Sequence, residues 1–163
     1  MEMGHLEFLG GLYLDNDEEP CIPELLIEAT LLGGAKKFKE GPKAKAGIFV
    51  IAPAKIKYDG PKDAEELWES PDFRSRTPAK IGQSKVMRTR PIFHEWEIEF
   101  EINFDDEMLD EERLLEWAKA AGAQVGLGDW RPRHGRFLVK VVEGKNGKSV
   151  MSKKKRRMVA AES

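Results

Sequence analysis

The clearest hydrophobic pattern in the chain is a strict alternation of apolar and polar residues between residues 94 and 104. Successive side chains of a β-strand point to opposite faces, so this alternation predicts a strand with one face in the core. The other face is acidic, which favours solvent or cross-strand lysine partners over a metal site. The apolar positions are Trp96, Ile98, Phe100, Ile102 and Phe104, and the open positions are Glu95, Glu97, Glu99, Glu101 and Asn103.

Two segments have the spacing of helices with one apolar face. The first begins at Pro23, a residue suited to the first helical position, and ends before Gly41-Pro42. The second begins at Asp110, whose side chain can cap the first turn. The predicted apolar faces are Leu26, Ala29, Thr30 and Gly33 in the first helix, and Leu114, Ala118, Ala121 and Val125 in the second.

Three further segments are expected to form strands: residues 6–14, interrupted at Gly10-Gly11, residues 47–51 and residues 137–141. Between residues 52 and 92, five prolines occur too often for long regular elements, which indicates an ordered insertion. The order is therefore strand, helix, strand, insertion, strand, helix, strand. It predicts the α+β class and one ferredoxin-like βαββαβ domain over residues 1–143, with an antiparallel sheet and the insertion 52–92 between the two middle strands.

The composition is that of a soluble globular protein, with 40% hydrophobic and 34% charged residues in a chain of 163. No apolar run approaches the roughly 18–20 residues needed to span a bilayer. No signal peptide opens the chain, so we expect a cytoplasmic protein without a membrane partner. The single cysteine, Cys21, excludes a disulfide framework, and the three histidines lack partners at ligand spacing, so we expect no metal and no other cofactor.

The formal net charge of −2 conceals a strong segregation of charge along the chain. Residues 95–116 hold eleven acids and one arginine, whereas residues 71–92 hold six basic residues and one acid. Residues 144–163 begin with a basic, polar stretch that is expected to be a disordered tail. Local potential of this kind steers charged partners, and the basic segments favour an anionic one.

A glycine- and arginine-rich stretch follows the second predicted helix, within Ala121–Glu143. Its glycines allow positive φ or close backbone approach, and three arginines and one tryptophan lie among them. Backbone N–H groups beside guanidinium groups suit a phosphodiester backbone, whereas a helix cap followed by a solvated loop is the alternative interpretation. The residues concerned are Gly122, Gly126, Gly128, Trp130, Arg131, Arg133, His134, Gly135 and Arg136.

Two motifs resemble those of the RAMP superfamily, the ferredoxin-like RNA-binding subunits of CRISPR effector complexes. The run from Gly126-Leu127-Gly128 to Arg136-Phe137 is similar to the C-terminal glycine-rich loop of that family. Ile22-Pro23, followed by Gly33-Gly34 and Lys36-Lys37, is similar to the start of the first helix in its backbone subunits. The chain departs from the family at Glu24, where glycine is favoured. The resemblance implies RNA binding by a CRISPR-related, stand-alone relative, encoded by a phage and acting in the cytoplasm of a bacterial host.

We therefore expect a non-catalytic protein that binds the backbone of single-stranded RNA or DNA. One alternative is a protein–protein module, such as an inhibitor, an assembly factor or a homo-oligomer, that uses the acidic sheet face. The other is a metal-independent endoribonuclease in which His134 acts as general acid or base and Arg131 or Arg133 stabilises the phosphorane. The expected nucleic-acid-binding residues are Gly126, Gly128, Trp130, Arg131, Arg133, His134, Gly135, Arg136, Arg74, Arg76, Arg88 and Arg90.

Overall fold

The computed structural model describes residues 2–142 and 153–162, which fall into two compact units. Unit 1 comprises Met1–Cys21 and Lys55–Trp96, and unit 2 comprises Ile22–Ala54 and Glu97–Ser163. The sequence pattern predicts one domain with an insertion, whereas most of that insertion groups with the N-terminal segment as unit 1. Among the described residues, no helix has both the length and the apolar character needed to cross a bilayer.

The N-terminal segment of unit 1 is a helix, α1 (Met3–Gly11), so the prediction of a strand over residues 6–14 is wrong. The apolar residues of this segment belong to a helix instead, and Phe8 is fully buried. Glycines let the helix approach its neighbour closely, because a Cβ on Gly4 would lie 3.1 Å from the hydroxyl oxygen of Thr89 and one on Gly11 would lie 3.1 Å from Pro91 Cδ. Tertiary packing therefore overrides the weak local preference for a strand.

The predicted insertion is more regular than its prolines indicate. Its main feature is an antiparallel hairpin of β4 (Arg74–Ile81) and β5 (Ser84–Pro91), with Gly82 at positive φ in the turn. Prolines are tolerated on edge strands, and both strands of a two-stranded hairpin are edges. The other elements of the insertion are β3 (Ala54–Lys57), α4 (Ala64–Glu69) and a 3₁₀ turn, η1 (Pro71–Phe73). A short strand, β1 (Cys21–Ile22), precedes α2.

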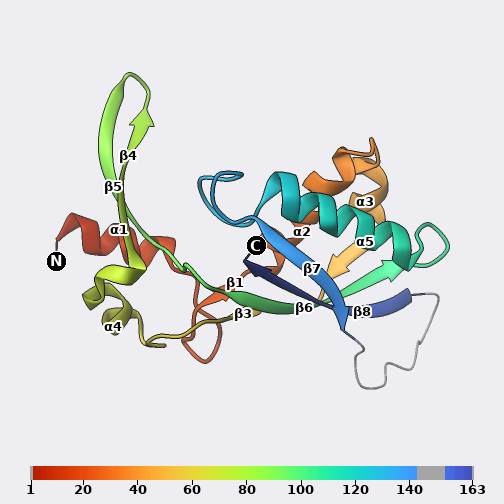
Figure 1. Ribbon diagram of the computed structural model, residues 1–163, viewed down its shortest axis with the longest axis horizontal. Helices are drawn as coiled ribbons and strands as arrows, with labels where there is room; N and C mark the ends of the chain where they lie inside the picture. Colours follow the sequence, from red (N-terminus) through yellow and green to blue (C-terminus); the bar gives the residue numbers. More distant parts are fainter. Residues whose placement is uncertain (1, 143–152, 163) are drawn as a thin grey trace. The chain divides into compact units, whose positions relative to one another are not determined.

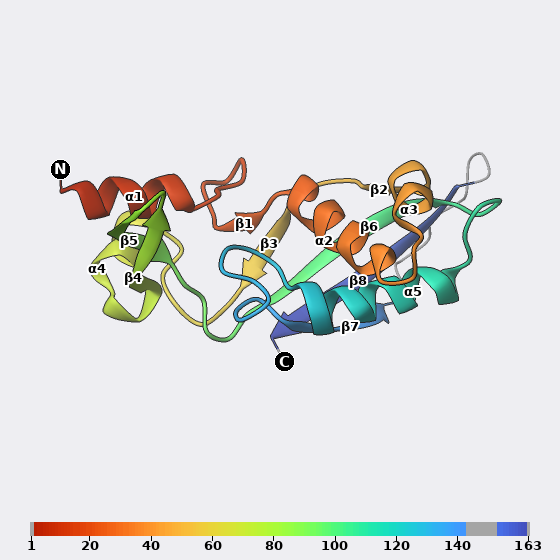
Figure 2. The same cartoon turned by 90° about the horizontal axis from the view of Figure 1, so that it is seen from above.

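Unit 2 is an antiparallel sheet covered on one face by helices (Figure 1). The pairings β2–β6, β6–β8 and β8–β7 are all antiparallel, which gives the order β2, β6, β8, β7. Figure 2 shows α2 and α5 side by side over this sheet. The elements are α2 (Glu24–Lys36), α3 (Gly41–Gly47), β2 (Ile48–Val50), β6 (Glu97–Asp105), α5 (Glu111–Ala120), η2 (Ala121–Val125), β7 (Phe137–Val142) and β8 (Lys153–Glu162).

The two strongest sequence signals are confirmed in unit 2. Strand β6 alternates as predicted, with Ile98, Phe100, Ile102 and Phe104 all buried. Helix α5 begins at the predicted cap, where Asp110 Oδ1 accepts a hydrogen bond of 2.7 Å from the Arg113 amide. The α+β class and the antiparallel sheet are therefore as predicted.

Strand β8 differs from the disordered tail predicted for residues 144–163. Residues 143–152 lie outside the described part of the chain, but Lys153–Glu162 form a strand between β6 and β7. Strand β8 pairs with the facing edges of both β6 and β7. Without it, the backbone groups on these edges would be unpaired. The register also places Lys153 opposite Asp105 and Arg157 opposite Glu101. At these two positions a basic residue lies beside an acidic one, whereas Lys154 and Arg156 lie opposite Phe104 and Ile102.

Candidate nucleic-acid interface

The glycine- and arginine-rich loop is closed at its base by backbone hydrogen bonds. The Gly126 amide donates to Ala121 O at 2.9 Å and ends the π-helical turn η2. The Leu127 amide donates to Gly135 O at 2.8 Å, and the His134 amide donates to Trp130 O at 3.1 Å. Leu127 itself is buried, so the base of the loop is attached to the core while residues 129–134 remain exposed.

The glycines of the loop are needed for two different reasons, as the sequence predicts. Gly126, Gly128 and Gly135 have φ near +80°, a conformation that side chains rarely adopt. A Cβ on Gly135 would also overlap the carbonyl oxygen of Leu127, and one on Gly122 would overlap that of Phe137. Gly128 has open space around it, so there only the backbone conformation requires glycine.

Trp130 lies on the exposed part of the loop in an unfavourable backbone conformation. Its φ is 58°, and 49% of its surface is exposed. A left-handed conformation costs a non-glycine residue on the order of 1–3 kcal/mol and is often found at binding sites. The indole contacts His134 with the ring centroids 5.5 Å apart. The side chain is therefore not part of the buried core, and about half of its surface is accessible from solvent.

The three arginines of the loop are exposed to solvent. Arg136 Nε donates to Pro132 O at 2.9 Å, which holds the end of the loop. Within residues 2–142, neither Arg131 nor Arg133 takes part in an ion pair. The loop therefore presents positive charge that no described carboxylate neutralises.

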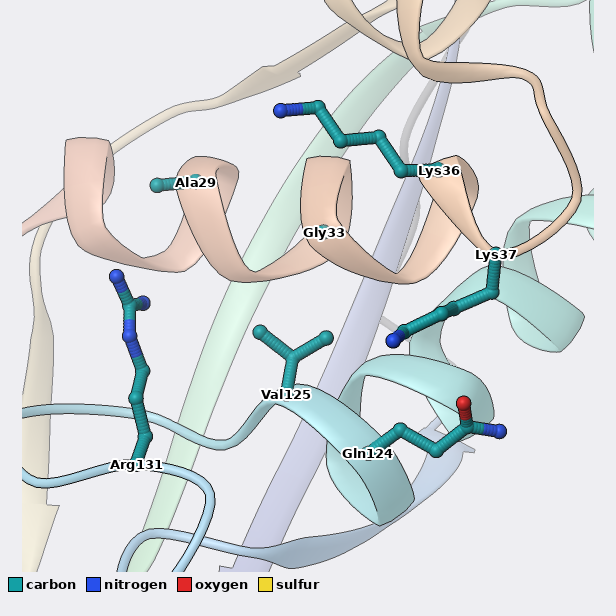
Figure 3. Close-up of a pocket in the computed structure, with 7 residues that line it drawn as sticks. All are labelled: Ala29, Gly33, Lys36, Lys37, Gln124, Val125 and Arg131. Carbon is teal, nitrogen blue, oxygen red and sulfur yellow. The ribbon is translucent and has the colours of Figure 1, made fainter.

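Beside the loop, α2 and η2 border an open hollow of about 510 Å³ (Figure 3). Arg131 reaches from the loop toward α2 near Ala29, and Lys37 extends toward η2 from beyond the other end of α2. Val125 lies between them and points toward Gly33. The lining residues are Ala29, Gly33, Lys36, Lys37, Gln124, Val125 and Arg131.

Helix α2 packs against both α5 and the base of the loop. Gly34 allows the close approach to α5, because a Cβ there would overlap Trp117 O. The Thr30 hydroxyl donates to Leu26 O at 2.9 Å and lies 3.4 Å from Gly126 O. These contacts bring Lys36 and Lys37 to the hollow, although sequence reasoning does not place them in the site. Their position just after Gly33-Gly34 is the signal in the sequence that points to them.

The arginines expected in the insertion belong to unit 1, whereas the loop arginines belong to unit 2. Arg88 pairs with Glu7 of α1, and the Arg74 guanidinium lies 4.8 Å from the centre of the Trp68 ring. The pKa of the Glu7 carboxyl is lowered. The main cause is the hydrogen bond of 3.1 Å that the carboxylate accepts from the Thr89 amide, and Arg88 lowers the pKa further. Arg90 also has a partner, whereas Arg76 is exposed. The structure therefore gives Arg74 and Arg88 packing roles within unit 1.

The acidic and histidine residues form no recognisable metal centre in the described part of the chain. His5 stacks on Trp68 with the ring centroids 4.7 Å apart, and its Nε2 lies 2.8 Å from a Glu65 carboxylate oxygen. His94 and His134 are exposed.

No protein-family model matches the chain, and comparisons with curated proteins and with solved structures give no match either. The fold and the site therefore define an α+β protein with an exposed basic loop beside a lysine-lined hollow.

Proposed function

We propose that this protein binds the backbone of single-stranded RNA or DNA without catalysis, through the loop Gly126–Arg136. The observation that carries the proposal is the loop itself, which is closed at its base and exposes Arg131 and Arg133 without ion pairs among the described residues. Guanidinium groups on an ordered loop suit phosphate oxygens, because little conformational entropy is lost when they bind. The exposed Trp130 adds a surface on which a base can stack.

The hollow beside the loop extends the basic surface. Lys36, Lys37 and Arg131 come from two elements and line one concave region. Neighbouring cations attract a polyanion more strongly than scattered ones, and each phosphate that they neutralise releases counterions. This arrangement favours a continuous anionic ligand over a single small anion.

We also propose that unit 2 has a ferredoxin-like sheet in which the C-terminal strand replaces the first one. A βαββαβ sheet places its first strand between the third and fourth, antiparallel to both. Strand β8 lies between β6 and β7 and is antiparallel to both. This order, and the position of the loop between α5 and β7, support the proposed relationship to the RAMP superfamily.

The alternative of protein binding through the acidic face of β6 has less support. Strand β8 pairs along the whole of β6, so one edge of β6 is not available to a protein partner. The ribonuclease alternative rests on His134 alone, and its partner across 5.5 Å is the Trp130 ring rather than an acid that could orient it.

Fluorescence anisotropy with a labelled single-stranded oligonucleotide tests the proposed function. Arg131→Ala combined with Arg133→Ala is expected to weaken binding at least about tenfold, because charge-assisted hydrogen bonds contribute about 1.5–3 kcal/mol each. The salt dependence, as the slope of log K against log salt, should fall by roughly 1.4 for two lost contacts to a single strand. Lys45→Ala combined with Lys119→Ala removes two exposed helix cations away from the loop and serves as the matched control.

Unchanged affinity in the arginine variant would contradict the proposal and leave the loop as a helix cap. Cleavage of the oligonucleotide by the wild type, lost in His134→Ala, would instead establish the ribonuclease.

A further inference from the structure

The hollow beside α2 has cationic ends and an apolar floor. Arg131 lies at one end near Ala29, Lys37 lies at the other, and Val125 forms the floor between them (Figure 3). A helix rises 1.5 Å per residue, so Ala29 and Lys37 are about 12 Å apart along its axis. Arg131 and Lys37 thus reach the hollow from its two ends, with Val125 between them.

The hollow exists because α2 presents small residues along this line. Ala29 and Gly33 line it, and Gly33 lets Val125 pack directly against α2, because a Cβ there would lie only 2.9 Å from Val125 Cγ1. Lys36 is the one long side chain of α2 among the lining residues. The hollow is open to solvent, and its volume of about 510 Å³ leaves room for a group larger than a phosphate.

We propose that the hollow receives one nucleotide of the bound strand. The sugar and base lie against Val125 and the small residues of α2, and the flanking phosphates lie at Arg131 and Lys37. This inference rests on the proposed function and specifies the ligand of the same site. A nucleotide can enter only if its base is unpaired, so the site selects single strands over duplexes.

Filling the hollow without changing any charge tests this inference. Ala29→Leu replaces one strong helix former of α2 by another, and the larger side chain occupies part of the hollow. Ala123→Leu, at an exposed alanine of η2 outside the hollow, is the matched control. The ligands are a thymidine oligonucleotide, an abasic chain of equal length that keeps every phosphate, and a duplex. Binding is measured by anisotropy and folding by circular dichroism and thermal melting.

The wild type and Ala123→Leu should bind the oligonucleotide at least about fivefold more tightly than the abasic chain, as expected for a bound base. Ala29→Leu should reduce that preference to the part that stacking on Trp130 supplies, and it should keep its affinity for the abasic chain. A preference in Ala29→Leu equal to that of the wild type would overturn the inference and leave the proposed function standing. Failure of the wild type to bind any of the three ligands would overturn both.

Lys37→Gln provides a second test that does not depend on packing in the hollow. It should weaken oligonucleotide binding at least about fivefold, because a charge-assisted phosphate contact is lost. Lys39→Gln, at an exposed lysine that does not line the hollow, should have no such effect. Equal effects of the two substitutions would show a general charge effect and count against a nucleotide held at the end of the hollow.

Discussion

At the scale of single residues, Trp130 combines an unfavourable backbone conformation with a partly exposed side chain. Its positive φ is unfavourable for a large side chain, and yet almost half of the indole stays exposed. An indole in the core would offset the strain by burying apolar surface, and this one does not. The arrangement is understandable if the ring contacts a ligand.

Trp130→Ala should therefore weaken oligonucleotide binding by about 1–3 kcal/mol, the range for base–aromatic stacking. The melting temperature should change little, because the side chain is not part of the core. Anisotropy and thermal melting of the same samples provide the measurement. A large fall in stability would contradict the exposed position, and an unchanged affinity would exclude stacking.

Glu40 is the residue whose ionisation contributes most clearly to stability in unit 2. One carboxylate oxygen accepts hydrogen bonds from Arg113 Nε and Trp117 Nε1, both at 2.8 Å. The Arg113 hydrogen bond is the main cause of the lowered pKa of Glu40. A carboxyl with a lowered pKa stabilises the fold at pH values above its unfolded pKa, near 4.3, and loses this contribution as pH falls through the folded pKa.

The melting temperature of the wild type should therefore fall as pH drops from about 5 toward 3. Glu40→Gln should be less stable than the wild type at neutral pH, and the difference should shrink over the same acidic range. Glu112→Gln, at an exposed glutamate of α5, is the control. A difference between wild type and Glu40→Gln that stays constant with pH would show that the Glu40 charge is not involved.

At the scale of elements, the glycines of the loop differ in whether an added side chain would meet a neighbouring atom. Gly128 and Gly135 have the same positive φ, but only Gly135 faces a backbone atom, the Leu127 carbonyl oxygen. The two positions thus separate the cost of backbone conformation from the cost of steric overlap.

Gly128→Ala should cost about 1–2 kcal/mol, the penalty for a left-handed residue. Gly135→Ala should cost clearly more, because the loop cannot close on Leu127 without moving. Urea denaturation of both variants measures the difference. Equal destabilisation would mean that the base of the loop is loose enough to accommodate the added methyl group.

At the scale of the whole molecule, the sheet of unit 2 depends on its last strand. Strand β8 pairs with β6 from Glu97↔Ala161 to Asp105↔Lys153, and with β7 from Phe137↔Glu162 to Val142↔Arg157. Without β8, the two strands would face each other across a gap with unpaired backbone groups.

Removal of residues 153–163 should therefore lower the melting temperature and promote aggregation, as judged by circular dichroism and size-exclusion chromatography. An excess of a synthetic peptide of residues 153–162 should restore part of the lost stability, because it can occupy the vacant position. A truncated chain as stable and soluble as the full one would show that this segment is a passive tail.

The sequence by itself determined the features that depend on local periodicity and backbone freedom. Strand β6 follows from the alternation of Ile98 to Phe104, the start of α5 follows from Asp110, and the shape of the loop follows from its glycines. Each of these depends on residues that are close in sequence, so the pattern alone contains the information.

Only the tertiary structure decided which distant segments meet. It made residues 3–11 a helix, because Gly4 and Gly11 pack closely against Thr89 and Pro91. It placed β8 between β6 and β7, paired Arg88 with Glu7, and brought Lys37 and Arg131 to one hollow. These outcomes are contacts between residues far apart in the chain. Their free energy depends on burial, backbone pairing and charge in the folded state, which no local pattern specifies.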